Sequence, residues 1–375
     1  MTKANKILVA VLVAQVALVA LVYTRSGASS VEPPRLLFAG FDAEDVAKIA
    51  ISEAPDDDAK AKNAGPDVVL SRKGEGWVLT SHADYAVTTD KVDTLLTALA
   101  QAKVRAPIAT SESRRGQLGV DAAKFRKKVT VTTTGGKATT FFIGERAAGG
   151  NVAIRLDNDD AIYAVASSVA SAAGTSARTW VDPTIAEVAT ETIATMAVTT
   201  PAGSYTFALM PGGKKWSLEG APEGDKAKAL DQAFINRMAK KLTKLTLNDI
   251  VGAKDAPEYG LAAPLATVTV TLRPQPPEGT AEDPASAAVS VAPEVVTLTI
   301  GALADDRHYY VKTGTGPYIF TVLKSTLEPF TQTGPDTVFE AAKSDAKNGQ
   351  SAKPGKGTKA PAHPAPAAPS PTPAH

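Results

Sequence analysis

The sequence predicts an α+β fold, in which an N-terminal transmembrane helix precedes two similar modules of mostly antiparallel strands, each with one longer helix. Three observations predict it. Residues 7–24 form an uncharged, almost wholly apolar run. The order of short motifs over residues 36–184 recurs over residues 185–340. Residues 341–375 are mostly Ala, Pro, Lys, Gly and Ser, which predicts a disordered tail.

The apolar run favours a membrane anchor. At about 1.5 Å rise per residue it spans roughly 27 Å, close to the thickness of a hydrocarbon core. Lys3 and Lys6 precede the run and only Arg25 follows it closely, so residues 1–6 are predicted to be cytoplasmic. We expect a single pass through the inner membrane, with the body in the periplasm or outside the cell. A signal peptide cleaved near residues 26–28 is the alternative, and both export the body.

Composition excludes several classes of function. The 375 residues hold 40 basic and 39 acidic side chains, a net charge of +1, and no cysteine. Residues 1–30 carry +3 and the tail +4, so residues 31–340 carry −6. The missing cysteines exclude disulfides, thiolate metal sites and a cysteine nucleophile. A balanced charge argues against nucleic acid as a partner.

Paired motifs indicate that the body is an internal repeat of one module. Trp77 in GEGWVLT corresponds to Trp216 in GKKWSLE, and each precedes a helical pattern, over residues 88–102 and from Asp231 to Leu245. The opening strands, residues 46–51 and 193–198, also correspond. Further pairs are Leu118-Gly119-Val120 with Tyr259-Gly260-Leu261, Val129-Thr130-Val131 with Val268-Thr269-Val270, Phe142-Ile143-Gly144 with Thr299-Ile300-Gly301, Ile154-Arg155 with Val311-Lys312, and 162–165 with 319–322. Residues 54–67 and 274–294 are inserts of loop composition.

The order of these motifs resembles the bacterial domain of unknown function 4340 family. The resemblance covers about residues 1–340: an apolar N-terminal helix, then W-x-L before a helix, then L/Y-G-V/L before Val/Thr strands, then I-G. It implies an envelope protein associated with ABC-transporter components of the gliding-motility type. The family has no established catalytic residues, so the resemblance assigns none.

Candidate catalytic residues are few. Ser81, His82 and Asp84 include the residue types of a hydrolase triad, but near-consecutive loop residues rarely converge in the geometry that a triad needs. An exposed loop is the better interpretation. His308 has no second histidine nearby and is read as an edge-strand residue. We therefore predict no catalytic, cofactor-binding or metal-binding residue and no enzyme activity.

Runs of charged residues are interpreted as turns, loops or strand ends rather than as ligand-binding sites. Residues 157–160, DNDD, lack the glycine and the later glutamate of a calcium loop, so a hairpin turn is favoured over weak calcium binding. Residues 56–58 read as a solvated acidic run. The basic cluster 126–128 reads as a strand entrance, and residues 353–358 lack the pattern of a phosphate loop.

The recurring Trp and Gly residues are read as parts of the scaffold. Trp77 and Trp216 are expected to pack in the two cores. Gly119, Gly260 and the glycines at 144 and 301 are expected at positions that need backbone freedom.

These observations favour a non-enzymatic, membrane-anchored envelope protein that is an accessory subunit of an ABC-type transport or surface-assembly complex. The alternative is a free-standing envelope structural or cell-wall-polymer-binding protein. The expected partners are the membrane and an envelope protein complex. The basic tail, residues 341–375, is either an inert solubilising segment or a contact with anionic wall polymer or lipid.

Overall fold

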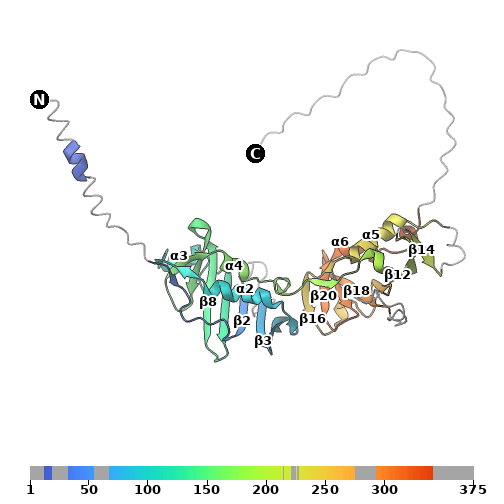
Figure 1. Ribbon diagram of the computed structural model, residues 1–375, viewed down its shortest axis with the longest axis horizontal. Coiled ribbons are helices and arrows are strands. Elements are labelled where there is room, and N and C mark those ends of the chain that lie inside the picture. The colour runs from blue at the N-terminus through green and yellow to red at the C-terminus, as the bar shows by residue number, and fades with distance from the viewer. Residues whose placement is uncertain are drawn as a thin grey trace, which may run out of the picture.

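Two antiparallel sheets of eight strands each form the body of the protein, and Figure 1 shows how the strands and helices of the two modules are arranged. The computed structural model describes residues 12–18, 33–54, 67–213, 215–220, 225, 228–274 and 293–340. Every strand pair within these residues is antiparallel, which is consistent with the predicted arrangement of two β-rich modules.

The predicted transmembrane helix requires correction. Of the apolar run 7–24, the structure describes only residues 12–18, which are helical. Within the described part of the chain, no helix is long and apolar enough to cross a membrane. This finding contradicts the transmembrane part of the fold prediction and the single-pass, inner-membrane placement that rested on it. Most of the two inserts and the tail, residues 341–375, lie outside the described residues.

The first sheet has the strand order β10-β9-β8-β7-β2-β3-β4-β5. Its strands are β2 (Val46–Glu53), β3 (Val68–Lys73), β4 (Gly76–Leu79), β5 (Tyr85–Ala86), β7 (Lys127–Thr133), β8 (Ala138–Arg146), β9 (Asn151–Leu156) and β10 (Ile162–Ala166). Beside it, β1 (Arg35–Leu36) pairs with β6 (Lys103–Val104). The predicted turn at residues 157–160 joins β9 to β10, and the Gly135-Gly136 turn joins β7 to β8.

The second sheet repeats this plan with the order β14-β13-β12-β17-β18-β19-β20-β16. Its strands are β12 (Ile193–Thr200), β13 (Gly203–Leu209), β14 (Trp216–Glu219), β16 (Asp249–Gly252), β17 (Ala266–Leu272), β18 (Val295–Asp305), β19 (His308–Thr313) and β20 (Ile319–Leu323). A short pair joins β11 (Thr184–Ala186), which precedes the second sheet in the chain, to β15 (Leu245–Thr246), which precedes β16.

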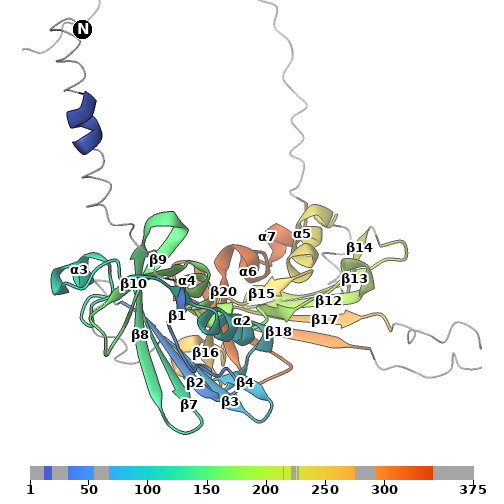
Figure 2. The ribbon, with the colours of Figure 1, turned by 60° about the vertical axis from the view of Figure 1, so that its left-hand side comes forward.

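One face of each sheet is covered by helices (Figure 2). The α-helices of the two modules are α2 (Thr89–Ala100), α3 (Glu112–Gln117), α4 (Ser168–Ala172), α5 (Gln232–Leu242), α6 (Lys324–Thr331) and α7 (Pro335–Val338). The short 3₁₀ turns are η1 (Thr80–His82), η2 (Ala148–Gly150), η3 (Ala177–Thr179), η4 (Thr190–Thr192) and η5 (Pro257–Tyr259). The long helix of each module, α2 or α5, packs with a later short helix, α4 or α6.

The two longer helices form where the apolar stripes predicted them. In α2 the buried residues include Val92 and Leu99, which lie on one helical face. Helix α5 begins after Asp231, whose carboxylate accepts a hydrogen bond from the Phe234 N–H at 2.9 Å. It ends at Leu242, so Leu245, predicted on the same stripe, lies in β15 instead.

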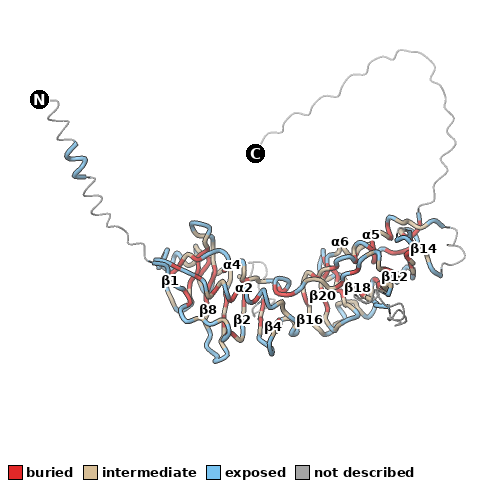
Figure 3. The backbone as a smooth tube through the Cα atoms, viewed as in Figure 1, coloured by how far each residue is buried: buried red, intermediate tan, exposed pale blue. Residues whose placement is uncertain are grey.

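Alternation along the strands separates core from surface. Side chains that face the helices are almost all apolar and buried, and Figure 3 shows buried residues, drawn in red, in both sheets. The buried side chains form one cluster that extends from the first module into the second. Trp180, fully buried in the connecting segment, belongs to this cluster and donates its indole N–H to the Gly174 carbonyl at 3.0 Å.

The recurring glycines serve two different purposes. Gly119 and Gly260 have φ values of +63° and +65°, so the predicted need for backbone freedom is confirmed at these positions. Gly144 and Gly301 have ordinary φ values. A Cβ at Gly144 would overlap the Leu118 carbonyl oxygen, and one at Gly301 would overlap the corresponding Tyr259 oxygen. Each module therefore uses a side-chain-free strand position to let a loop carbonyl approach.

The joint between the modules brings two sheet edges together. Tyr85 of β5 packs edge-on against Tyr318, with ring centroids 4.7 Å apart, and lies 5.9 Å from Phe320 of β20. Burial and the neighbouring Tyr318 raise the pKa of Tyr85 above its usual value. The Thr88 N–H donates to the Trp180 carbonyl at 2.8 Å, which ties α2 to the connecting segment.

Gly144→Ala is expected to lower the free energy of unfolding by about 2–3 kcal/mol, because the new methyl group must displace the Leu118 carbonyl. Urea denaturation of the purified protein measures this change. Gly76→Ala in β4 is the control, since a Cβ there meets no atom within 4 Å. Equal stability of the two variants would contradict the close-approach role of Gly144.

Candidate interaction surface

The structure brings together part of the Ser81, His82 and Asp84 group. Ser81 Oγ lies 2.8 Å from His82 Nδ1, but it also accepts the Val69 N–H at 3.1 Å. Asp84 turns away and pairs with Lys73 at 3.3 Å. The carboxylate nearest the imidazole comes from the second module instead.

That carboxylate belongs to Asp249 of β16, whose Oδ1 lies 3.7 Å from His82 Nε2. This distance is longer than that of the oriented hydrogen bond that a catalytic base receives. Ser81 is engaged with the backbone of β3, and His82 connects η1 to the second module. The group therefore stabilises the joint.

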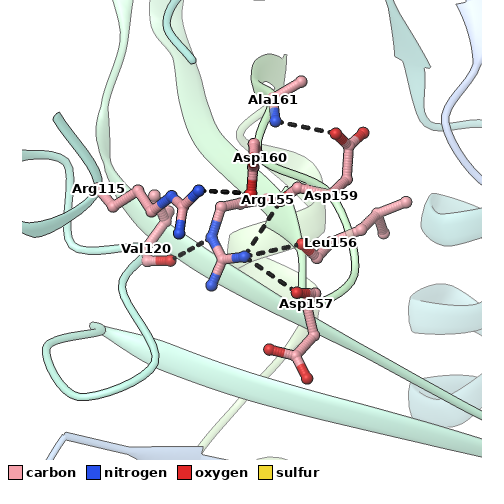
Figure 4. Close-up of polar contacts among 8 residues, drawn as sticks. All are labelled: Arg115, Val120, Arg155, Leu156, Asp157, Asp159, Asp160 and Ala161. Atoms are coloured by element: carbon pink, nitrogen blue, oxygen red, sulfur yellow. Dashed lines mark hydrogen bonds and ion pairs between the residues drawn. The ribbon is translucent and has the colours of Figure 1, made fainter. Parts of the chain in front are cut away.

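The acidic run 157–160 is the predicted hairpin turn, and Arg155 organises it (Figure 4). Arg155 is only 3% exposed. Its Nε donates to the Val120 carbonyl at 2.8 Å, and its Nη1 donates to the carbonyls of Leu156, Asp157 and Asp159 at 3.0–3.2 Å. A buried guanidinium thus holds the loop that contains Val120 against the β9–β10 turn.

The carboxylates of this turn are also engaged within the protein. Asp159 accepts the Ala161 N–H at 2.9 Å, and Asp160 pairs with Arg115 of α3. Burial lowers the pKa of Arg155, and Arg115 adds to this effect. In the second module the position of Arg155 is taken by Lys312, which pairs with Asp255 at 2.8 Å at a more exposed site.

The three side chains of the basic cluster 126–128 point in different directions. Arg126 pairs with Glu145 at 3.0 Å. Lys127 Nζ donates to the Ala170 and Ala173 carbonyls at 3.0 and 2.7 Å, and burial lowers its pKa. Lys128 is exposed on the opposite face of β7. The three side chains therefore do not form one basic patch.

His308 closes the β18–β19 turn. Its Nδ1 lies 2.8 Å from Asp305 Oδ2, and Asp305 also accepts the Arg307 N–H at 2.7 Å. These hydrogen bonds, that from His308 first, lower the pKa of Asp305. Although β19 was expected at a sheet edge, it lies between β18 and β20.

The two repeated tryptophans lie in the cores, as predicted. Arg72 stacks over Trp77 at 5.0 Å, and the Trp216 indole N–H donates to Asn236 at 3.0 Å. Residues 56–58 and 353–358 lie outside the described residues. In the part of the chain that the structure describes, no three His, Asp or Glu side chains are grouped as metal ligands.

The outer face of the second sheet is rich in hydroxyl groups. On β12, β13, β17 and β18 it presents twelve side chains, nine of which carry hydroxyl groups and none of which is charged. We call these residues the threonine face. They are Thr195, Ala197, Thr199, Ser204, Thr206, Ala208, Thr267, Thr269, Thr271, Val295, Thr297 and Thr299.

Strand register aligns these side chains in rows across the sheet. Thr199 lies between Ser204 and Thr267, and its Oγ1 is 2.9 Å from Ser204 Oγ. The central row contains Ala197, which is opposite Thr206 on one side and Thr269 on the other. Most of these residues are half-buried, because each side chain is flanked by its neighbours on adjacent strands.

The first module provides an internal comparison. Its corresponding face carries Lys48 and Lys128 at the positions of Thr195 and Thr267. Charged residues are the usual occupants of a solvated sheet face, because they oppose unwanted association. High β-propensity explains threonine on strands of either module. It does not explain why lysine stands at these two positions in only one of the two copies.

Toward the far end of the second sheet, the outer face is covered by the segment around η5. Tyr259 of this segment packs against Tyr310 of β19, with ring centroids 4.5 Å apart. In the first module, Val120 and Phe142 belong to a small apolar cluster at the corresponding place. The threonine face begins beside this cover.

Comparison with known proteins places the chain in a family. The family model described as "Domain of unknown function (DUF4340)" matches residues 77–264 and residues 229–341. The chain belongs to the DUF4340 family. Two overlapping matches accord with the repeated fold of this family member. No curated protein and no solved structure has significant similarity to it.

Arg155→Met in this DUF4340 protein is expected to reduce the free energy of unfolding by about 3 kcal/mol, since the buried Val120 carbonyl and three part-buried carbonyls lose their donor. The matched change in the second module, Lys312→Met, is expected to cost less than about 1 kcal/mol, because Lys312 makes one partly exposed ion pair. Chemical denaturation compares the two variants. A larger loss for Lys312→Met would contradict this assignment.

Asp305→Asn is expected to destabilise the protein in a pH-dependent way. The lowered pKa of Asp305 means that its carboxylate stabilises the fold above the ordinary value of about 3.9, and that this stabilisation is lost as the pH falls through the folded-state pKa. Melting temperatures between pH 3 and pH 7 should therefore converge for wild type and variant at the acidic end. Asp306→Asn is the control, and a pH-independent difference for Asp305→Asn would count against the Asp305–His308 contact.

Proposed function

We propose that this protein is a non-catalytic interaction subunit of a multiprotein assembly, and that the threonine face forms the centre of its protein contact. The observation that carries the proposal is the complete lack of charge at the twelve positions of this face, beside lysines at the matching positions of the first module. Depletion of charged residues distinguishes the centre of a protein interface from the remaining surface.

The size of the face agrees with this role. Three outward residues on each of four strands cover roughly 19 by 20 Å, or about 400 Å², at ordinary strand spacings. A standard interface buries about 800 Å² on each partner. The threonine face therefore supplies about half of such a contact. Charged residues at its margin, such as Glu219 and Lys312, are suited to the polar rim.

The half-polar character of the face favours a partner that can dissociate. Permanent interfaces are more apolar than the general surface, whereas separable ones resemble it. Threonine presents both a methyl and a hydroxyl group, so it can pack in a complex and remain hydrated without a partner. The assembly that the family resemblance implies is an ABC-type transport or surface-assembly complex, in which this protein is an accessory subunit.

Ala197→Lys is expected to abolish partner binding, because it places an ammonium group at the centre of the threonine face. Cross-linked pull-down from native extracts, with quantitative identification of the captured proteins, measures the effect. A lysine on an open sheet face keeps its charge in water, so the free energy of unfolding should change by less than about 0.5 kcal/mol.

Ala50→Lys is the matched control, since Ala50 has the same place in the first sheet. It should leave the captured proteins unchanged. A chain that lacks residues 341–375 tests the alternative of a polymer- or lipid-binding tail and should also keep its partner. Equal capture by wild type and Ala197→Lys would contradict the proposal.

A further inference from the structure

The four outer edges of the two sheets differ in how they are covered. The edges formed by β5 and β16 are both covered at the joint between the modules, where Tyr85 of β5 packs against Tyr318 and β16 contacts η1 and η3. At β10, Ile162 exchanges backbone hydrogen bonds of 2.8 Å with Ile108 and Ala109. Strand β14 forms the fourth edge, and within the described residues no strand pairs with its outer side.

Two residues of β14 direct their backbone groups outward. The Met210 N–H donates to the Lys215 carbonyl at 2.9 Å, which makes these residues a hydrogen-bonded pair of the β13–β14 ladder. Such pairs alternate along an antiparallel ladder. The N–H and C=O groups of Trp216 and Leu218 therefore point away from β13.

Gln232, the first residue of α5, satisfies both outward groups of Trp216. Its side-chain oxygen accepts the Trp216 N–H at 2.8 Å, and its side-chain nitrogen donates to the Trp216 carbonyl at 2.9 Å. A primary amide in this position makes the two hydrogen bonds that a residue of a neighbouring strand would make. For Leu218, no hydrogen bond from a described residue to its backbone is found.

In the first module, the edge of β4 that corresponds to the outer edge of β14 is paired with another strand. There the Val87 N–H donates to the Trp77 carbonyl at 3.0 Å, and Tyr85 of β5 pairs with Leu79. Trp77 and Leu79 correspond to Trp216 and Leu218. An extended strand thus occupies in the first module the place that the Gln232 amide occupies in the second.

We propose that Gln232 is an edge-capping residue that prevents β14 from pairing with β14 of a second copy of this chain. A free strand edge is a template for pairing, and proteins commonly block such edges with specific side chains. A second copy is the occupant that the strand sequence favours, because the strand is complementary to itself.

The complementarity follows from the register of a two-fold pair. When Ser217 lies opposite Ser217 of the second copy, Trp216 lies opposite Leu218, and all four outward residues form backbone hydrogen bonds. In the same register Lys215 of each copy lies opposite Glu219 of the other. The two cross-strand ion pairs favour this register over others.

Gln232→Ala is expected to make the full-length protein dimerise more strongly than the wild type. Analytical ultracentrifugation over a range of concentrations should show self-association at least about tenfold tighter than in wild type, or about 1.4 kcal/mol. Asn236→Ala is the matched control, because it removes the indole contact of Trp216 from the next turn of α5 and leaves the edge amide in place.

Charge exchange tests the occupant and the register. Lys215→Glu added to Gln232→Ala should abolish the dimer, and Glu219→Lys added to both should restore it. The proposal would be overturned if the Gln232→Ala dimer persisted after Lys215→Glu, or if Gln232→Ala folded but stayed monomeric. It would also be overturned if the wild type were already a dimer that Lys215→Glu dissociates.

Amide exchange in the wild-type protein is a test that does not depend on the folding of a variant. The Trp216 amide should be protected and the Leu218 amide should exchange much faster. Equal exchange of the two amides would overturn the capping role. Gln232→Glu, which keeps the side-chain size but cannot donate to the Trp216 carbonyl, should shift self-association in the same direction as Gln232→Ala.

Discussion

The alternation of side chains across the second sheet is the constraint on which the remaining features depend. Because successive residues of a strand point to opposite faces, burying Met196 and Val198 under the helices forces Thr195, Ala197 and Thr199 to the other side. The same argument holds for each neighbouring strand. The threonine face is therefore as rigidly positioned as the core behind it, and a one-residue slip would exchange the two.

Duplication lets one module serve as a reference for the other. Positions that carry the same kind of residue in both copies, such as Trp77 with Trp216 or Gly144 with Gly301, maintain the fold. Corresponding positions that differ between the copies point to specialised roles. By this criterion the uncharged threonine face and the Gln232 cap belong to the second module, while the buried Arg155 turn belongs to the first.

The sequence predicted the strands and helices, because these depend on local patterns of apolar and polar residues. The Val/Thr alternation at residues 268–270 marked strands, and the apolar stripe before Leu99 marked α2. It could not predict contacts between distant segments. The partner of His82 is Asp249 of the other module rather than the adjacent Asp84, and Gln232 caps a strand that ends 13 residues earlier. Apolar composition at 7–24 predicted a span that the described helix does not form.

Site-specific photocross-linking tests the central claim most directly. A photoreactive amino acid at Thr269, in the middle of the threonine face, is compared with the same residue at Thr130, its counterpart in the first module. Irradiation in native extracts should give a covalent adduct with one partner protein from position 269 and none from position 130. Adducts of equal yield from both positions, or from position 130 alone, would contradict the account.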